Sequence, residues 1–519
     1  MEYLRNNKNI LNKGVYPIVN YGLEKELELE LLSKEELINN ALKFHSKGNI
    51  KKAKLFYEAF LDRNLIDPRM LLNYGVICNQ EKKYNQAIQI YKKTIKLYPK
   101  SPYAYSNLGR VLKEKGKLDE AEEYLLKAIN LKNNFEDAFL NLGIVLNQQC
   151  KYTEAAIYTK KAIEIKPDFV QAHVSLSNIF YNVGDLERSE KHARKAIKYD
   201  RSNANAHRNL SHVLIKKKEF QEGWKEYEWR WKIKDRKFKI GEKIQTNQPE
   251  WRLGTKGKVF LWCEQGIGDQ ILFSSLMPEL LKLVDQLIIK IDERLIPLYK
   301  RTYGTKITYI EENQIINDRN FDYQIPMGSL PRILRPNLES FKKAAIFKLI
   351  GNEEKAKRYK KLLIESKKTK IVGISWKSSS KINSSKSIDL GQLIKKIYRP
   401  EIKFVNLQYG EVKAEIDNIK EKYNIIINDI EEIDKFNDID SLAALISSCD
   451  EIISINNVTA HLAGALNINT KIILPTNASW DYGENDSTSY WYQSMRLYRQ
   501  RVPGDWTDVL DQLNKEFNQ

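Results

Sequence analysis

Small residues recur every 34 positions through the first half of this sequence. One column of them comprises Ala41, Gly75, Gly109, Gly143, Ser177 and Ser211, and a second column, twelve residues further on, comprises Ala53, Ala87, Ala121, Ala155, Ser189 and Gly223. A small side chain lets two helices approach closely, so two such columns indicate two helices per unit that pack against each other. The spacing therefore constrains this half of the chain to an array of stacked helix pairs.

A 34-residue period with this pattern is typical of the tetratricopeptide repeat. We assign residues 34–231 to six units, the last of them modified, and residues 1–33 to an N-terminal extension. We expect the concave face of such an array to bind a protein or peptide, rather than to serve only as a spacer or a dimerisation surface. Five asparagines are expected to be exposed, where they either bind an extended backbone or are simply solvated: Asn73, Asn107, Asn141, Asn178 and Asn209.

The last unit changes character over residues 220–231, where three tryptophans and a tyrosine fall on one amphipathic helix. Large aromatic side chains at helical spacing are usually packed rather than ligand-binding. We therefore expect this helix to join the repeats to the next domain, followed by a linker or seam over residues 232–256.

Beyond residue 256, short apolar runs alternate with helical ones, which predicts parallel sheets with helices on both faces. Nine strands are predicted, at residues 259–263, 286–291, 306–310, 323–326, 370–376, 403–407, 425–427, 451–455 and 471–475. We interpret them as two Rossmann-like lobes, residues 257–345 and 370–500, with a linker at 346–369 and a C-terminal helix at 501–519. Ligands are expected at the carboxyl ends of the strands.

Composition and charge narrow the class of function. The net charge of +18 comes from 85 basic and 67 acidic residues that are spread along the chain, which argues against a specific nucleic-acid partner. The four cysteines lack metal-binding spacing, so we expect reduced thiols and no metal site. No apolar run is long enough to span a membrane, and the first twenty residues lack a signal core, so we predict a cytoplasmic protein.

A glycine turn, Gly266-Ile-Gly268, follows the first predicted strand of the first lobe. Ile271 stands where a dinucleotide-binding fingerprint requires a third glycine or an alanine, so a nicotinamide or flavin enzyme is a poor fit. Asp269 opens the following helix. Its carboxylate either caps that helix, which the residues alone favour slightly, or acts as a general base toward an acceptor hydroxyl.

A second polar turn, residues 456–461, follows a predicted strand of the second lobe. The backbone amides of Asn457, Val458, Thr459 and Ala460 are predicted to meet a diphosphate at the helix start, with Asn456 just before them. The Thr459 hydroxyl and the His461 ring could bind the same oxygens. Lys377 and Lys381, after the strand at 370–376, either neutralise phosphate charge or are solvated.

Six motifs in order make the chain resemble bacterial proteins in which tetratricopeptide repeats precede a glycosyltransferase domain. That domain is related to the heptosyltransferase group, glycosyltransferase family 9, and more distantly to O-GlcNAc transferase. The motifs are Gly223-Trp-Lys-Glu-Tyr-Glu-Trp-Arg-Trp231, Glu264-Gln-Gly-Ile-Gly-Asp269, Gly373-Ile-Ser-Trp376, Val405-Asn-Leu-Gln408, Thr459-Ala-His-Leu-Ala-Gly-Ala-Leu466 and Trp491-Tyr-Gln-Ser-Met-Arg-Leu-Tyr-Arg-Gln500.

The resemblance implies a metal-independent GT-B glycosyltransferase of two Rossmann-like lobes, with a nucleotide sugar as donor substrate and no further cofactor. By analogy, Asp269 is the base in an acceptor-side turn formed by Gln265, Gly266 and Gly268, and residues 456–461 hold the donor phosphates. Three positions depart from the usual pattern: Asn456 stands in place of Asp, Asn467 in place of a helix-ending Gly, and Thr470 in place of Pro.

Three functions follow from these patterns. The first is transfer of a sugar to a protein or peptide that the repeats recruit. The second is a non-catalytic repeat scaffold whose lobes only bind a nucleotide, which the departure at Asn456 favours. The third is transfer to a saccharide or lipid, with the repeats used for assembly.

Overall fold

The computed structural model of the chain describes residues 29–233, 243–310, 314, 316–345, 347–364, 369–378 and 386–517. The chain divides into two compact units, Met1–Ala172 and His173–Gln519. This division falls inside the repeats, so the last repeat helices belong to the same unit as the two sheets. Among the described helices, none is both long and apolar enough to cross a membrane.

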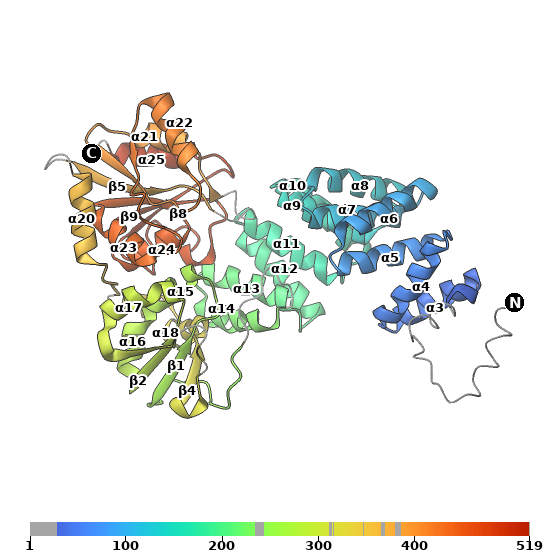
Figure 1. The fold of residues 1–519 in the computed structure, drawn as a ribbon, viewed down its shortest axis with the longest axis horizontal. Helices are drawn as coiled ribbons and strands as arrows, with labels where there is room; N and C mark the ends of the chain where they lie inside the picture. Colours follow the sequence, from blue (N-terminus) through green and yellow to red (C-terminus); the bar gives the residue numbers. More distant parts are fainter. Residues whose placement is uncertain are drawn as a thin grey trace, which may run out of the picture. The chain divides into compact units, whose positions relative to one another are not determined.

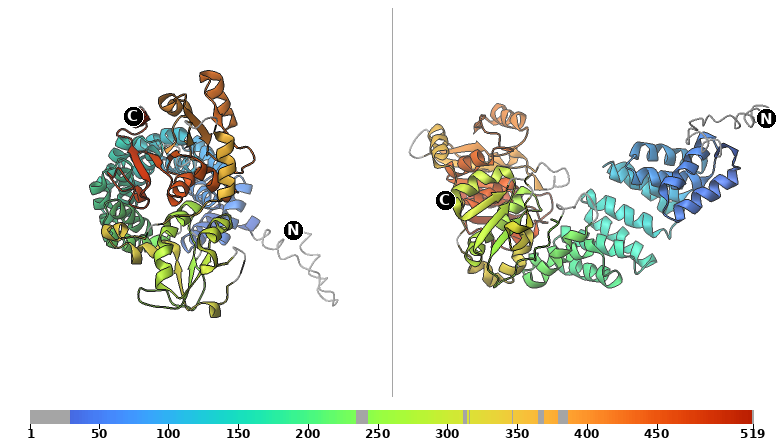
Figure 2. Two further views of the ribbon diagram at one scale, coloured as in Figure 1. Left: turned by 90° about the vertical axis from the view of Figure 1, so that its left-hand side faces the viewer. Right: turned by 60° about the horizontal axis from the view of Figure 1, so that its bottom comes forward.

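The first unit is built from helices that pack as successive pairs (Figure 1, and from two other directions in Figure 2). Its helices are α3 (Lys34–Ser46), α4 (Ile50–Asp62), α5 (Pro68–Gln80), α6 (Tyr84–Leu97), α7 (Pro102–Glu114), α8 (Leu118–Leu131), α9 (Glu136–Gln148) and α10 (Tyr152–Ile165). The predicted columns of small residues lie where paired helices touch. A Cβ atom added at Gly109, for example, would lie only 2.6 Å from the Leu125 side chain.

A third column at the same spacing, which the sequence analysis missed, lies in the turns between paired helices. Its six residues all have positive φ: Gly48, Lys82, Gly116, Cys150, Gly184 and Lys218. Glycine adopts this conformation readily, whereas a residue with a Cβ is strained there by roughly 1–2 kcal/mol. Half of the turns in the array therefore carry a local strain that the packing of the helices overcomes.

The last repeats continue into the second unit as α11 (Val170–Asn182), α12 (Leu186–Tyr199), α13 (Ala204–Lys216), α14 (Phe220–Tyr227) and the 3-10 helix η2 (Glu228–Lys232). The aromatic residues here form a packed seam, as predicted. Trp224 is buried, its indole N–H donates to the Arg335 carbonyl at 2.8 Å, and its ring lies 5.6 Å from that of Trp480.

Two details of the repeats differ from expectation. The aromatic residues do not share one helix, because α14 ends at Tyr227 and Trp229 and Trp231 lie on η2. Asn209 is buried rather than exposed, and its amide donates to the Val174 carbonyl at 3.2 Å. That asparagine is therefore used inside the array and is not available to a bound peptide.

The first lobe contains a four-stranded parallel sheet in the order β3-β2-β1-β4. Its strands are β1 (Lys258–Trp262), β2 (Gln286–Lys290), β3 (Ile307–Ile310) and β4 (Tyr323–Pro326). One face packs on α15 (Ile267–Phe273), α16 (Met277–Leu283) and α17 (Ile296–Tyr303). Among the described residues, the other face is covered by Trp231 of η2 and by the loop residues Ile244, Ile316 and Phe321 rather than by α-helices, which corrects the expectation of helices on both faces for this lobe.

The second lobe contains a six-stranded parallel sheet in the order β10-β9-β8-β5-β6-β7. Its strands are β5 (Lys370–Ser375), β6 (Ile402–Asn406), β7 (Ile427–Asn428), β8 (Glu451–Ile455), β9 (Thr470–Leu474) and β10 (Met495–Arg499). Helices α20 (Glu353–Leu363), α23 (Ile439–Ser448) and α24 (Val458–Ala465) pack on one face, and α21 (Leu390–Ile397), α22 (Lys413–Tyr423) and α25 (Thr507–Phe517) on the other. The edge strand β10 was not predicted.

In the sequence, the segment between β4 and β5 contains α18 (Leu330–Leu334), α19 (Leu338–Lys342) and α20, and α20 falls within the predicted linker. One hydrophobic core runs from Ile215 and Trp224 of the last repeat, through the first sheet, to Leu497 of the second. Burial of apolar surface stabilises the folded state by roughly 25 cal/mol per Å². A continuous core of this extent therefore stabilises the end of the repeats and the lobes together, as one structural unit.

Two substitutions in the third column test whether positive φ costs stability there: one removes the strain and the other introduces it. We expect Lys82→Gly to raise the free energy of unfolding by about 0.5–1 kcal/mol, because Lys82 is exposed and has φ of 61°. The reciprocal control is Gly116→Lys, which should lower the free energy of unfolding by about 1 kcal/mol. Because nothing lies within 4 Å of an added Cβ at Gly116, this loss would come from the backbone conformation and not from a steric clash. The midpoint of unfolding in urea measures the change in stability of each variant. Equal midpoints for the two variants would contradict a cost of positive φ at these turns.

Candidate functional site

The start of α24 lies at the point where the strand order of the second sheet reverses, between β5 and β8. Asn457 follows β8, and its amide donates to the Ser375 hydroxyl at the end of β5 at 2.7 Å. The Asn457 side-chain oxygen accepts the Ala460 N–H at 3.2 Å and so caps α24. Ligands of open parallel sheets usually bind at such a reversal. Asn457 therefore fixes the helix start in the expected place.

The other predicted donor-side side chains are also used within the lobe. The Thr459 hydroxyl is buried and donates to the Leu407 carbonyl at 3.4 Å, and the Asn456 side chain accepts from the Tyr482 hydroxyl at 3.3 Å. The first amides of α24, including that of Val458, have no partner within the helix. These backbone groups, rather than the side chains of Asn456 and Thr459, are the ones that a phosphate would meet.

Of the two predicted lysines, Lys377 is used within the second lobe. Lys377 forms an ion pair with Glu415 and lines a cavity of about 570 Å³ between the start of α21 and α22. Lys381 lies outside the described residues. Lys386, which the sequence analysis did not single out, is half-buried; burial lowers its pKa, and the carboxylates of Asp481 and Asp269 oppose that effect. Lys386 therefore places a cation beside the predicted base.

The two turns predicted as separate sites lie in direct contact. A Cβ atom added at Gly268 would lie 3.4 Å from Cδ2 of His461 and 3.9 Å from Cγ2 of Val458. The first turn of α15, which carries Asp269, therefore rests on the first turn of α24. This contact brings the turn predicted to face an acceptor, in one lobe, to the helix start predicted to hold the donor phosphates, in the other.

Asp269 does not cap its helix. The N-cap residue of α15 is Gly266, and in the part of the chain that the structure describes the Asp269 carboxylate makes no hydrogen bond. Burial raises the pKa of Asp269 to about 7, with further contributions from Asp481 and Glu264 and an opposing one from Lys386. A carboxylate without internal partners and with a pKa near neutrality has the properties of a general base.

His461 and Asp481 complete the cluster. Asp481 is buried on the 3-10 helix η9 (Trp480–Tyr482), and its Oδ2 lies 3.9 Å from Nε2 of His461. Burial lowers the pKa of His461, whereas Asp481 raises it. Among the described residues the buried Nδ1 of His461 has no hydrogen-bond partner. Asp481 and Lys386 lie well beyond the ends of β9 and β5, so no local pattern in the sequence placed them beside Asp269.

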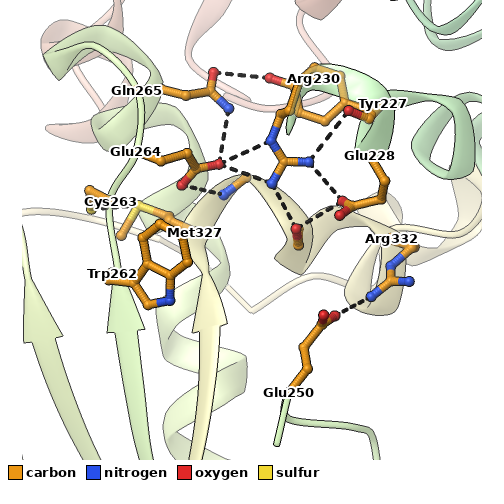
Figure 3. Close-up of polar contacts among 12 residues, drawn as sticks. Tyr227, Glu228, Arg230, Glu250, Trp262, Cys263, Glu264, Gln265, Met327 and Arg332 are labelled. Carbon is orange, nitrogen blue, oxygen red and sulfur yellow. Dashed lines mark hydrogen bonds and ion pairs between the residues drawn. The ribbon is translucent and has the colours of Figure 1, made fainter. Parts of the chain in front are cut away.

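The first sheet also reverses its strand order, between β1 and β4, but its own chain fills that position (Figure 3). The Arg230 guanidinium, from η2, donates to Glu264 after β1 at 3.0 Å and to Ser329 after β4 at 2.7 Å. It also donates to Glu228 at 2.7 Å. Burial raises the pKa of Glu264, and the positive charge of Arg230 opposes that effect. The end of the repeats therefore occupies the place where such a sheet usually binds a ligand.

The same network holds the turn that leads to Asp269. The Tyr227 hydroxyl donates to Gln265 at 2.9 Å, and the Gln265 amide donates to Glu264 at 3.3 Å (Figure 3). A Cβ atom added at Gly328 would lie 2.5 Å from both the Gln265 amide and the Glu264 carboxylate, so no free space remains. Gln265, predicted as part of the acceptor-side turn, is thus positioned by residues of the last repeat.

Comparison with known proteins identifies the repeats. Three models described as tetratricopeptide repeat match residues 67–134, 106–168 and 170–203. The chain therefore carries tetratricopeptide repeats over residues 67–203, as predicted, and repeats of this kind generally mediate protein–protein binding.

Similarity to individual proteins is more distant. Protein FlbA of Caulobacter vibrioides is 29% identical over 317 residues, which cover 56% of this chain and 51% of FlbA. The match thus spans about half the length of FlbA. Among solved structures, the MamA protein is 26% identical over 33% of this chain and 93% of its own, with a TM-score of 0.29. TTC0263, a thermophilic TPR protein of Thermus thermophilus, is 17% identical over 35% of this chain and 100% of its own, with a TM-score of 0.32.

The ion pairs that Arg230 and Arg332 form in Figure 3 provide a test of the Arg230 network. Arg230→Met should lower the free energy of unfolding by about 3–5 kcal/mol, because it leaves the buried Glu264 carboxylate without its cation. The control is Arg332→Met, whose pair with Glu250 is partly exposed and should cost at most about 1 kcal/mol. Adding Glu264→Gln to Arg230→Met should restore part of the loss. Equal costs for the two arginine variants in guanidinium unfolding would contradict the interpretation.

The raised pKa of Asp269 predicts a pH-dependent stability effect. Above about pH 7 the folded state must hold this carboxylate charged, whereas below the unfolded-state value of 3.8 it is neutral in both states. Asp269→Asn should therefore raise the melting temperature at pH 8 by about 2 °C or more and leave it unchanged near pH 3.5. The control is Asp292→Asn, which should lower it at pH 8, because Arg294 holds the pKa of Asp292 below its usual value.

Proposed function

We propose that this chain is a GT-B glycosyltransferase that transfers a sugar from a nucleotide-sugar donor to an acceptor. The observation that carries the proposal is the carboxylate of Asp269. It accepts no hydrogen bond from any described residue, has a pKa of about 7, and belongs to a helix turn that touches the start of α24. A base for the acceptor thus lies beside a helix start suited to phosphate.

In the proposed reaction, Asp269 accepts the proton of an acceptor hydroxyl as the hydroxyl oxygen forms a bond to the anomeric carbon. The bond from that carbon to the phosphate oxygen breaks, and the nucleoside diphosphate leaves with the electron pair. The N–H groups at the start of α24, the ring of His461 and the ammonium group of Lys386 stabilise the departing charge. These protein groups make the proposed transfer metal-independent.

We propose a protein or peptide as the acceptor, recruited by the concave face of the repeats. The contacts of Tyr227 with Gln265 and of Arg230 with Glu264 support this choice, since they connect the last repeat directly to the turn before Asp269. A saccharide or lipid acceptor is the alternative, in which the repeats would serve assembly.

A non-catalytic scaffold is the second candidate function. It is favoured by Asn456 in place of an aspartate, by the internal use of the Thr459 hydroxyl, and by the ion pair that occupies Lys377. In that case the lobes would bind a nucleotide without transferring a sugar.

A thermal-shift screen of UDP, GDP, ADP and CMP sugars tests the proposal. One class of donor should raise the melting temperature, because a ligand that binds only the folded state stabilises it by mass action. With that donor, the wild-type chain should slowly release the nucleotide by transfer to water. Asp269→Asn should lower this release by at least about 100-fold and retain the thermal shift.

Two further results separate the alternatives. Binding of a donor without release of nucleotide, even with acceptor candidates present, would favour the scaffold. Deleting residues 34–167 removes α3–α10 and keeps every repeat residue of the aromatic seam. This truncated chain should retain donor hydrolysis and lose transfer to protein; unchanged transfer to a saccharide would instead favour the alternative acceptor.

A further inference from the structure

Lys216 is buried at the end of α13. Its side chain is 2% exposed, and none of the described carboxylates forms an ion pair with its ammonium group. The ammonium donates to the Ala478 carbonyl at 3.1 Å and lies 4.8 Å from the ring centre of Tyr181. Burial and the charge of Arg499 lower the pKa of Lys216 to about 8, and the carboxylates of Glu484 and Asp481 oppose that effect. Removing the ammonium group from water costs free energy, so its contacts point to a role other than stabilising the fold.

The carbonyl that Lys216 binds belongs to the loop between β9 and β10 that carries Asp481. Buried or half-buried side chains hold three alternate carbonyls in this loop: Lys216 and Tyr181 bind that of Ala478, Tyr490 binds that of Trp480 at 3.0 Å, and Arg499 binds that of Tyr482. Tyr490 and Arg499 belong to the second lobe itself. The contacts at Ala478 come from the repeats, as does the ion pair of Lys218 with Asp486 further along the loop.

We infer that Lys216 is a positioning residue of the last repeat, which fixes the loop so that Asp481 faces His461 and the turn of Asp269. The ammonium group reaches the loop three residues before Asp481, and the Tyr181 hydroxyl reinforces it at 3.4 Å on the same oxygen. The role of this loop in sugar transfer rests on the proposed function, whereas the anchoring of the loop does not.

The anchoring predicts an unusual combination of effects in Lys216→Met, which keeps the length of the side chain and removes its charge. Amide hydrogen exchange over residues 476–484 should become about tenfold faster, because the loop loses one charged hydrogen bond. The melting temperature should not fall, since no buried charge remains. The ring of His461, followed by NMR and assigned with His461→Gln, should titrate at lower pH, because Asp481 raises its pKa. Lys386 also influences that ring and stays in place.

Two matched variants complete the experiment in the full-length chain. Lys216→Arg keeps a donor for the Ala478 carbonyl and should exchange in this segment nearly as slowly as the wild type. Lys217→Met removes the neighbouring lysine, which pairs with Glu190 at 2.7 Å, and should leave the loop unchanged.

The inference is overturned if Lys216→Met leaves both the exchange of residues 476–484 and the titration of His461 as in the wild type. It is also overturned if the variant lowers global stability and accelerates exchange throughout the unit, because Lys216 would then be only structural. Should Lys216→Met fail to fold, Tyr181→Phe must accelerate exchange in the same segment, and no change would again overturn it. None of these results depends on whether the chain transfers a sugar.

Discussion

The buried guanidinium of Arg230 is the interaction on which the connection between repeats and lobes depends. A charge taken out of water must be paired and hydrogen-bonded, and Arg230 meets this requirement with groups from three separate segments: its own 3-10 helix, the turn after β1 and the turn after β4. The three segments can therefore adopt one relative arrangement only. Since the turn after β1 leads into Asp269, the end of the repeats helps to define where that carboxylate lies.

A second consequence concerns the two sheets. Each sheet reverses its strand order once, and each reversal is a natural place for a ligand. In the first lobe Arg230 fills this place, so the reversal in the second lobe is the one that the proposed nucleotide sugar would use. The two sheets thus have the same kind of topology, and the difference between their reversals comes from a side chain that belongs to neither sheet.

The sequence allowed the repeats and most strands to be predicted, because both depend on local periodicity. The 34-residue period fixed the helix pairs, and the apolar runs located nine of the strands. Strand β10 was not predicted because Arg496 and Arg499 interrupt its apolar character at the edge of the sheet. Asp481 and Lys386 were not predicted for a different reason, because their proximity to Asp269 is set by packing between distant segments. The same packing decided that Asp269 would not act as a helix cap.

The place where the chain divides into two compact units has a consequence for how proteins of this kind can be recombined. The division lies at Ala172, within the repeats, whereas the change in sequence pattern comes near residue 231. Helices α11–α14 thus look like repeats in sequence and belong with the lobes in structure. A chimera that exchanges the recognition array while keeping the lobes intact needs its junction before α11. A junction at the end of the last repeat would remove Lys216, Trp224 and Arg230 from the partners that they hold.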